Sequence, residues 1–251
     1  LHRRVPPRWA DERCRVLLER ERDATGVSAA LAEVYAPSVG QGLHLLADDR
    51  EADLVVVGSC RRGHLGRVLL GDDARATVSG ASCAVAVAPH GYGEQPHLIN
   101  RVGVAYDDSG ESRAARAVAG SLAARDGCSV TAVTVVNPVS ITLGGWGGLA
   151  PAWSNLTDTL VEAANERLRA LDGLDERRDA VGDIGAELVA FGDEVDLLVV
   201  GSRARGPVRR VMLGSTSLQL THTARCPLLV GPRATRVGHP HASALHDPSG
   251  M

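Results

Sequence analysis

The sequence predicts an α/β protein made of two doubly wound parallel-sheet domains in tandem, the first of them incomplete. Three observations lead to this prediction: the chain contains an internal repeat, strand-like runs alternate with helical patterns in both copies, and the first copy is shorter than the second. The 251 residues suffice for two domains of ordinary size, each with a core of its own.

The repeat relates two apolar runs that each lead into a glycine-containing loop. Residues 53–59 read Asp-Leu-Val-Val-Val-Gly-Ser, and residues 196–202 read Asp-Leu-Leu-Val-Val-Gly-Ser. Aligned without a gap, 16 of the 37 positions in 53–89 are identical in 196–232, at an offset of 143 residues. That period is too long for a solenoid repeat and has the size of a whole small domain.

Strand-sized apolar runs alternate with helical patterns along both copies, which is typical of a parallel sheet covered by helices. The helices expected in the first copy cover 8–24, 40–50 and 72–81, and the strands expected there cover 27–35, 54–57 and 84–88. The strands expected in the second copy cover 101–106, 130–136, 197–200 and 228–231, and the helices cover 111–125, 155–171 and 215–224. Residues 137–153 are expected to form a flexible insertion, and 172–192 a short strand and a helix.

These patterns divide the chain into a first domain over 1–93, a linker over 94–100, a second domain over 101–233 and a disordered tail over 234–251. The repeat offset would place the counterpart of strand 101–106 ahead of Leu1, so the first copy lacks its first strand and helix. The chain also begins without Met, and we expect that it is truncated at its amino end. A sheet without its central strand keeps unpaired edges, so the first domain should be poorly ordered alone or depend on the second.

The composition excludes several classes of function. A net charge of −3 provides no overall basic field for nucleic acid. No apolar run approaches the roughly 20 residues of a membrane span. All 27 basic residues are arginine. Without lysine there can be neither a Walker A phosphate loop nor a Schiff-base amine.

The cysteines and histidines do not form a reactive or metal-binding pattern. The five cysteines are scattered without a Cys-x-x-Cys pair, which argues against a metal or redox motif and for a reducing cytosol. Cys83 and Cys226 occupy matching positions in the repeat, where we expect buried structural thiols. His222 has no evident nucleophile beside it, so no catalytic residue is assigned.

The second copy contains a pattern suited to holding a phosphate group. Gly201-x-x-Ala204-x9-Gly214-Ser215 follows an apolar run and opens a predicted helix. Glycine lets a ligand approach the backbone closely, and a helix N-terminus offers unpaired N–H groups and a partial positive charge to an anion. Hydroxyl and guanidinium donors accompany this loop: Thr216, Ser217, Arg203, Arg205, Arg209 and Arg210.

With these motifs, residues 5–232 resemble the universal stress proteins, in particular tandem-domain members of the actinobacterial type. The resemblance implies Rossmann-like domains related to the adenine nucleotide alpha hydrolases, with ATP as the ligand and Mg²⁺ accompanying it. Members that bind ATP carry Gly-x-x-Gly-x9-Gly-Ser/Thr, so Ala204 departs from the pattern at the middle glycine. Asp107 matches the family's aspartate at the end of the first strand, and Val135 matches the position whose backbone binds adenine.

The candidate residues for binding ATP are Ala105, Tyr106, Asp107, Val135, Val200, Gly201, Arg203, Ala204, Gly214, Ser215, Thr216 and Ser217. No residue is assigned a metal-binding role. Purely structural roles remain open for several of them. Gly201 and Gly214 could serve only as turn glycines, and Ser215 or Asp107 could cap a helix instead of facing a ligand.

The first copy departs from the binding pattern at two positions. Its loop reads Gly58-x-x-Arg61-x9-Gly71-Asp72, so Asp72 puts a carboxylate where a phosphate would meet the first helical N–H. Like charges at such short distance repel each other. We therefore expect no nucleotide site in the first copy.

Three hypotheses follow from the resemblance and the residues together. The first is a cytoplasmic, ATP-binding stress-response regulator with one site in the second domain and at most slow, incidental ATP hydrolysis. The second is a scaffold that binds no nucleotide and acts through dimerisation. The third and least favoured is a hydrolase or nucleotidyl transferase on a related fold. The resemblance also implies that 84–88 and 228–231 pair with each other within the chain, and it leaves a homodimer open; no nucleic-acid or membrane partner is expected.

Overall fold

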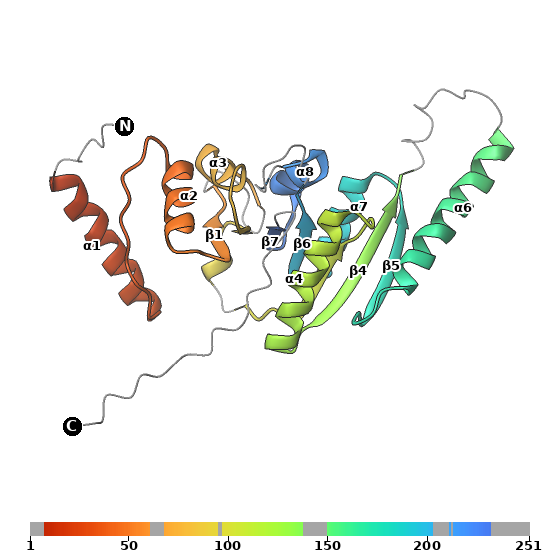
Figure 1. The fold of residues 1–251 in the computed structure, drawn as a ribbon, viewed down its shortest axis with the longest axis horizontal. Helices are drawn as coiled ribbons and strands as arrows, with labels where there is room; N and C mark the ends of the chain where they lie inside the picture. Colours follow the sequence, from red (N-terminus) through yellow and green to blue (C-terminus); the bar gives the residue numbers. More distant parts are fainter. Residues whose placement is uncertain are drawn as a thin grey trace.

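The computed structural model describes residues 8–60, 68–94, 97–137, 150–202, 211 and 213–231. In this part of the chain a single seven-stranded sheet runs through both copies of the repeat in the order β1-β2-β7-β6-β3-β4-β5 (Figure 1). The strands are β1 (Leu54–Gly58), β2 (Ala84–Ala88), β3 (Arg101–Ala105), β4 (Ser129–Val136), β5 (Glu176–Val181), β6 (Leu197–Gly201) and β7 (Leu228–Gly231). Neighbouring strands are parallel except β2 and β7, which are antiparallel.

The helices and one short turn connect these strands. They are α1 (Arg8–Thr25), α2 (Val39–Asp49), α3 (Asp72–Val78), η1 (Tyr92–Glu94), α4 (Gly110–Asp126), α6 (Ala150–Arg169), α7 (Ile184–Gly192) and α8 (Ser215–Thr223). The predicted strand and helix within 172–192 are confirmed as β5 and α7. The predicted end of the insertion at residue 153 was wrong, because helix α6 already begins at Ala150. The rest of the predicted insertion and the predicted tail lie outside the described residues.

The predicted α/β fold is confirmed, and in the second copy β6 is buried on both faces. Leu197 and Val199 point toward α4, whereas Leu198 and Val200 point toward the core beneath α7 and α8. Side chains that alternate between two faces can be apolar throughout only where helices cover both faces. This placement explains why the run Leu-Leu-Val-Val contains no polar residue.

The equivalent strand of the first copy is not buried on both faces, contrary to the expectation for 54–57. Leu54 and Val56 are 44% and 65% exposed, whereas Val55 and Val57 pack against the shared core. In the second copy the corresponding face of β6 is covered by α4. The described part of the first copy contains no counterpart of α4 or of the strand β3 beside it. The apolar sequence of β1 was therefore not sufficient to bury both of its faces.

The strand predicted over 27–35 is absent, and this segment runs without ladder hydrogen bonds. In the second copy the segment before α7 forms β5 by pairing with β4. Within the described residues the first copy has no counterpart of β4, so Val27–Tyr35 has no strand to pair with. Val27, Val34 and Tyr35 are accordingly exposed. Strand propensity is realised only where a partner strand satisfies the backbone.

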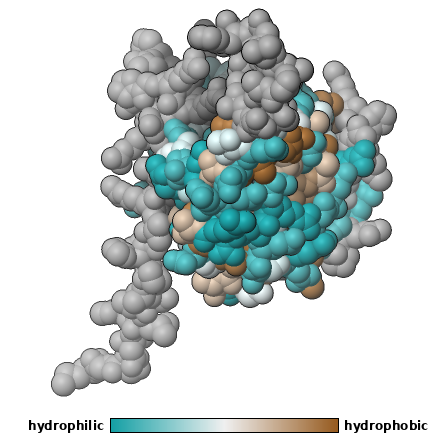
Figure 2. Space-filling view, turned by 90° about the vertical axis from the view of Figure 1, so that its right-hand side faces the viewer, coloured by the Kyte–Doolittle hydropathy of each residue, from teal (hydrophilic) through white to brown (hydrophobic). Residues whose placement is uncertain are grey.

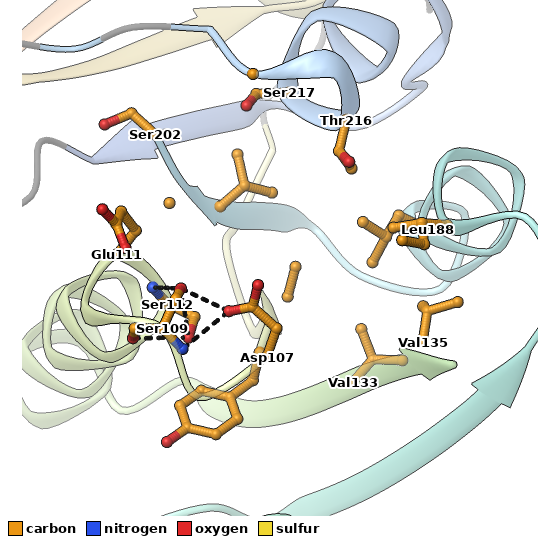
Figure 3. A pocket seen from close by; sticks show the side chains of 16 residues that line it. Asp107, Ser109, Glu111, Ser112, Val133, Val135, Leu188, Ser202, Thr216 and Ser217 are labelled. Carbon is orange, nitrogen blue, oxygen red and sulfur yellow. Dashed lines mark hydrogen bonds between the residues drawn. The ribbon is translucent and has the colours of Figure 1, made fainter. Parts of the chain in front are cut away.

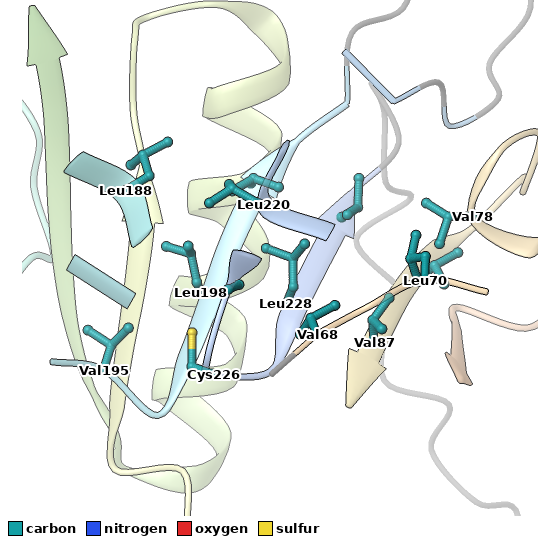
Figure 4. Close-up of a cluster of buried hydrophobic side chains, with 14 of the residues drawn as sticks. Val68, Leu70, Val78, Val87, Leu188, Val195, Leu198, Leu220, Cys226 and Leu228 are labelled. Carbon is teal, nitrogen blue, oxygen red and sulfur yellow. The ribbon is translucent and has the colours of Figure 1, made fainter. Parts of the chain in front are cut away.

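The two copies are joined through their last strands, as predicted for 84–88 and 228–231. Val85, Ala86 and Val87 of β2 lie opposite Val230, Leu229 and Leu228 of β7. Side chains from both copies form one core at this junction (Figure 4), with Val68, Leu70, Val78 and Val87 on one side and Leu198, Leu220 and Leu228 on the other. Most of the buried apolar residues described in the first copy thus belong to the core that it shares with the second.

The two edges of the sheet differ in character. At the β5 edge the strand carries the charged run Glu-Arg-Arg-Asp, and the face of the molecule at this end is mostly hydrophilic (Figure 2). Charged side chains on an edge strand oppose edge-to-edge association. At the other edge β1 is apolar throughout. No helix in the described part of the chain is long and apolar enough to cross a membrane.

The matching cysteines Cys83 and Cys226 are both buried and unpaired, as predicted. Burial raises the pKa of the Cys226 thiol to about 11. A thiol that stays protonated is a poor nucleophile, so these groups act as small apolar side chains.

Candidate functional site

A cavity of about 300 Å³ opens at the carboxyl ends of β3, β4 and β6. The neighbouring strands β3 and β6 are followed by helices on opposite faces of the sheet, α4 on one face and α8 on the other. The chain direction between strand and helix thus changes face at this point, and the first turns of α4 and α8 lie apart. Ligands of doubly wound sheets bind at such a point. The lining residues are Ala105, Tyr106, Asp107, Ser109, Glu111, Ser112, Val133, Val135, Ile184, Leu188, Val200, Gly201, Ser202, Gly214, Thr216 and Ser217.

The cavity has an apolar and a polar side (Figure 3). Val133, Val135 and Leu188 lie together on one side, and Ser202, Ser217 and Glu111 lie on the other, with the Asp107 carboxylate between them. An apolar slot beside a cluster of hydroxyl groups and a helix N-terminus suits a ligand with a flat apolar part and an anionic part.

The end of β3 is held rigidly at Tyr106. Its backbone N–H donates to Val133 O at 2.8 Å, and its carbonyl accepts from Thr134 Oγ1 at 2.7 Å. Its hydroxyl donates to Asp108 Oδ1 at 2.9 Å, and Arg113 Nη1 donates to the same oxygen at 2.6 Å. Asp108 has a positive φ of 62°, a conformation uncommon for a residue with a side chain. These bonds stabilise the turn that directs Asp107 toward the cavity.

Asp107 is held in its ionised form. Ser109 donates to Asp107 Oδ1 through its hydroxyl at 2.6 Å and through its backbone N–H at 3.1 Å. Partial burial raises the pKa of this carboxyl group, but the hydrogen bonds from Ser109 and Ser112 outweigh burial and leave the pKa below its ordinary value. The site therefore presents a carboxylate that can accept hydrogen bonds from a ligand.

The cap of α4 is Ser109 rather than Asp107, which settles one of the open alternatives. Ser109 Oγ accepts from the backbone N–H of Ser112 at 3.1 Å. The cap of α8 is Gly214, without a side-chain hydrogen bond. Ser215 is therefore the first residue of the helix and not its cap.

Position 201 requires glycine for a structural reason that the motif alone did not reveal. A Cβ at this position would lie 2.7 Å from the backbone carbonyl carbon of Glu111, in the first turn of α4. Only glycine permits this contact between strand and helix. In the first copy a Cβ on the equivalent Gly58 would meet nothing within 4 Å among the described residues. The difference reflects the helix that covers β6 but not β1.

Nine of the twelve predicted residues line the cavity: Ala105, Tyr106, Asp107, Val135, Val200, Gly201, Gly214, Thr216 and Ser217. Ser215 is exposed and is not among the lining residues. Arg203 and Ala204 lie outside the described residues. In the first copy Asp72 is the first residue of α3, at the place predicted for it.

The sequence analysis missed seven lining residues: Ser109, Glu111, Ser112, Val133, Ile184, Leu188 and Ser202. Val133 could have been found, because residues two apart on a strand share a face and Val135 was already assigned. Ser202 directly follows the assigned Gly201. Ile184 and Leu188 gave no signal, since they come from α7, which precedes β6 and belongs to none of the motifs.

The fold and this cavity define a tandem α/β protein with a ligand-sized cavity at the switch point of its sheet. A model of the universal stress protein family matches residues 6–89 and 99–232. The chain belongs to this family, and its two matched regions correspond to a tandem arrangement. Membership supports a role in the stress response. Among the described residues, no group of three or more His, Cys, Asp or Glu side chains could hold a metal ion.

Relatives in mycobacteria have a similar sequence. A universal stress protein of Mycobacterium tuberculosis is 35% identical over 191 residues, which cover 72% of this chain and 62% of the relative. One from Mycolicibacterium smegmatis is 31% identical over 194 residues, covering 74% of this chain and 64% of the relative. This chain thus spans less than two thirds of the length of these relatives.

Solved structures agree with the fold. A universal stress protein from Archaeoglobus fulgidus superposes with a TM-score of 0.61 at 19% identity, covering 90% of this chain and 79% of that chain. A protein of unknown function from Pseudomonas aeruginosa gives a TM-score of 0.63 at 14% identity, covering 91% and 80%. At these identities the likeness concerns the fold alone.

Proposed function

We propose that this protein binds ATP, with Mg²⁺, in the cavity of its second copy and acts as a stress-response regulator. The observation that carries the proposal is the convergence in one cavity of an apolar slot, an ionised carboxylate and a helix N-terminus. These three features match the three parts of a nucleotide, and nine residues selected from the sequence line the cavity.

The adenine ring would lie in the apolar slot formed by Val133, Val135 and Leu188. Backbone groups at the end of β4 would bind the edge of the ring. The Asp107 carboxylate would accept hydrogen bonds from the ribose hydroxyls, since it lies between the two sides of the cavity. An ionised acceptor forms stronger hydrogen bonds than a neutral one.

The phosphates would lie at the first turn of α8. Gly214 allows close approach, and Thr216 and Ser217 add hydroxyl donors beside the unpaired backbone N–H groups. The Asp107 and Glu111 carboxylates also line the cavity and would repel free ATP. Mg²⁺ accompanying the nucleotide would reduce this repulsion, so the Mg²⁺ complex is the expected ligand.

A regulator that holds ATP without turning it over fits the residues better than an enzyme does. The described residues that line the cavity include no histidine, cysteine or lysine. The hydrogen bonds that lower the pKa of Asp107 make its carboxylate a weak base, so it is poorly suited to activate a water molecule. Occupancy of the cavity would then be the property that partners detect.

A scaffold that binds no nucleotide is the second candidate. The exposed apolar edge at Leu54 and Val56 favours it, because exposed apolar strands tend to associate with other proteins. The two candidates differ in whether ATP binds at all.

The test is isothermal titration of the protein with ATP and Mg²⁺, repeated with Ser215→Asp. This substitution reproduces Asp72 of the first copy at the start of α8. An acidic residue in the first helical turn is favourable for the helix, so the fold should be retained. Repulsion of the phosphates should weaken ATP binding by more than about tenfold.

The matched control is Ser38→Asp at the N-cap of α2, which adds the same charge to another helix N-terminus. It should leave ATP binding unchanged. If the unmodified protein releases no heat with ATP, the nucleotide proposal fails and the scaffold remains. If Ser215→Asp binds as tightly as the unmodified protein, ATP binds elsewhere.

A further inference from the structure

One face of β1 lacks the helix that covers its counterpart in the second copy. Leu54 and Val56 are exposed and lie on the same face, because residues two apart on a strand share a face. Their repeat equivalents Leu197 and Val199 are buried beneath α4. The repeat therefore indicates that the apolar side of a helix fits this face of β1.

The helix α1 has an apolar side but no surface on which to pack it. None of the α1 side chains that the structure describes is buried, and Val16, Leu17 and Leu18 are 56%, 55% and 38% exposed. In Figure 1 this helix lies at one end of the molecule, beyond α2 and β1. A helix of this length is only marginally stable without tertiary contacts. We therefore expect α1 to find a partner surface.

The apolar side of α1 and the open face of β1 do not meet within one chain. At the repeat offset α1 corresponds to 151–168, which lie within α6, and α6 packs mainly on β4 and β5 rather than on β6. Arg15 of α1 pairs with Glu33 in the segment that leads to α2, with Nε and Oε1 3.5 Å apart. Two copies related by a twofold axis can cover both surfaces at once, since each copy supplies one helix and one strand face.

We propose that two copies of this chain associate reciprocally, with the apolar side of α1 from each copy packed on the open face of β1 in the other. Each contact joins Leu17 and Leu18 of one copy to Leu54 and Val56 of its partner. The rest of α1 is mostly arginine and glutamate, which would stay in water. Burying side chains that a single copy exposes stabilises the pair. This association does not depend on the binding of ATP.

The test is sedimentation equilibrium of the unmodified protein, of Leu17→Glu and of Val56→Glu. The unmodified protein should be mostly dimeric at about 100 µM, as expected for a dissociation constant in the micromolar range. Each substitution puts a charge into both apolar contacts of the dimer and should weaken association by more than about a hundredfold. Both side chains are exposed in a single copy, so the fold should be retained.

Mixing the two variants tests whether the contact joins α1 of one copy to β1 of the other. In a mixed pair, α1 of the Val56→Glu copy and β1 of the Leu17→Glu copy are both unmodified, so one of the two contacts is intact. Association should therefore be partly restored. A dimer held by two α1 helices would instead persist in Val56→Glu alone, and one held by two β1 strands would persist in Leu17→Glu alone.

The matched control is Val181→Glu on β5, which adds the same charge to an exposed valine at the other edge of the sheet. It should leave the dimer intact. The proposal is overturned if the unmodified protein is monomeric at this concentration, if either variant dimerises as well as the unmodified protein, or if mixing restores nothing. Leu17→Glu should bind ATP as the unmodified protein does, so a failure of ATP binding and a failure of this association are separate results.

Discussion

Val68 and Val211 occupy equivalent positions in the two copies, and each donates its backbone N–H across the junction to the opposite copy. Val68 donates to Ala224 O at 2.7 Å, and Val211 donates to Ala81 O at 2.8 Å. The acceptors Ala81 and Ala224 are themselves repeat equivalents, and both valines are fully buried. This reciprocal exchange follows the same approximate twofold relation as the pairing of β2 with β7. The two copies differ in the elements they contain, but the junction between them is approximately symmetrical.

Proline at either valine should weaken the junction, since proline lacks the donated N–H. We expect Val68→Pro and Val211→Pro each to lower the free energy of unfolding by about 1–3 kcal/mol, measured by urea denaturation. Val211 lies three residues before Gly214, so only Val211→Pro should also weaken ATP binding in a titration. Equal ATP affinity in both variants would show that the junction does not position the start of α8.

Alanine at the two matching glycines should have opposite effects. In Gly201→Ala the new Cβ would meet the Glu111 backbone, which cannot move without shifting α4, and we expect a loss of about 1–3 kcal/mol in the free energy of unfolding. In Gly58→Ala nothing described lies in the way, so the reduced entropy of the unfolded chain should stabilise the protein by about 0.4–1 kcal/mol. Denaturation of the two variants side by side provides the measurement. A similar loss in both would mean that β1 is covered as β6 is.

The Asp107 carboxyl should titrate below its ordinary pKa of 3.8. A group whose pKa is lower in the folded state stabilises the fold above its unfolded pKa, and this contribution disappears as pH falls through the lowered value. The stability advantage of the unmodified protein over Asp107→Asn should thus be present at neutral pH and lost in the range below about pH 4. NMR of the Asp107 carboxyl carbon reports its pKa directly. Denaturation of both proteins at each pH gives the difference in their free energies of unfolding.

Ser109→Ala tests the cause of this shift. It removes one of the hydrogen bonds that lower the pKa of Asp107, so the pKa of this carboxyl group should be higher in the variant than in the unmodified protein. It also removes the cap of α4, at a cost of about 1 kcal/mol in stability. An unchanged Asp107 pKa in Ser109→Ala would contradict the role given to the hydrogen bonds.

Much of the fold could be predicted because its signals are local. The runs that became β6 and β7 are apolar and β-branched, the loop after β6 is glycine-containing, and repeat positions recur at a constant offset. Local chemistry also placed Asp107 and Gly214 at the ends of elements that meet at one edge of a parallel sheet. For such a sheet, knowing which residues end the strands is nearly enough to know which residues share a cavity.

The sequence by itself determined the duplication, the order of the elements and most of the cavity residues, while the tertiary structure decided which of these patterns are buried and paired. Residues 27–35 have strand propensity but no partner strand, and Leu54 and Val56 repeat an apolar pattern but have no covering helix. Ser202 and Ser59 both follow Val-Val-Gly, yet Ser202 is fully buried and Ser59 is only half-buried. Hydrogen bonding and burial depend on neighbours brought together from distant parts of the chain, and those neighbours differ between the two copies.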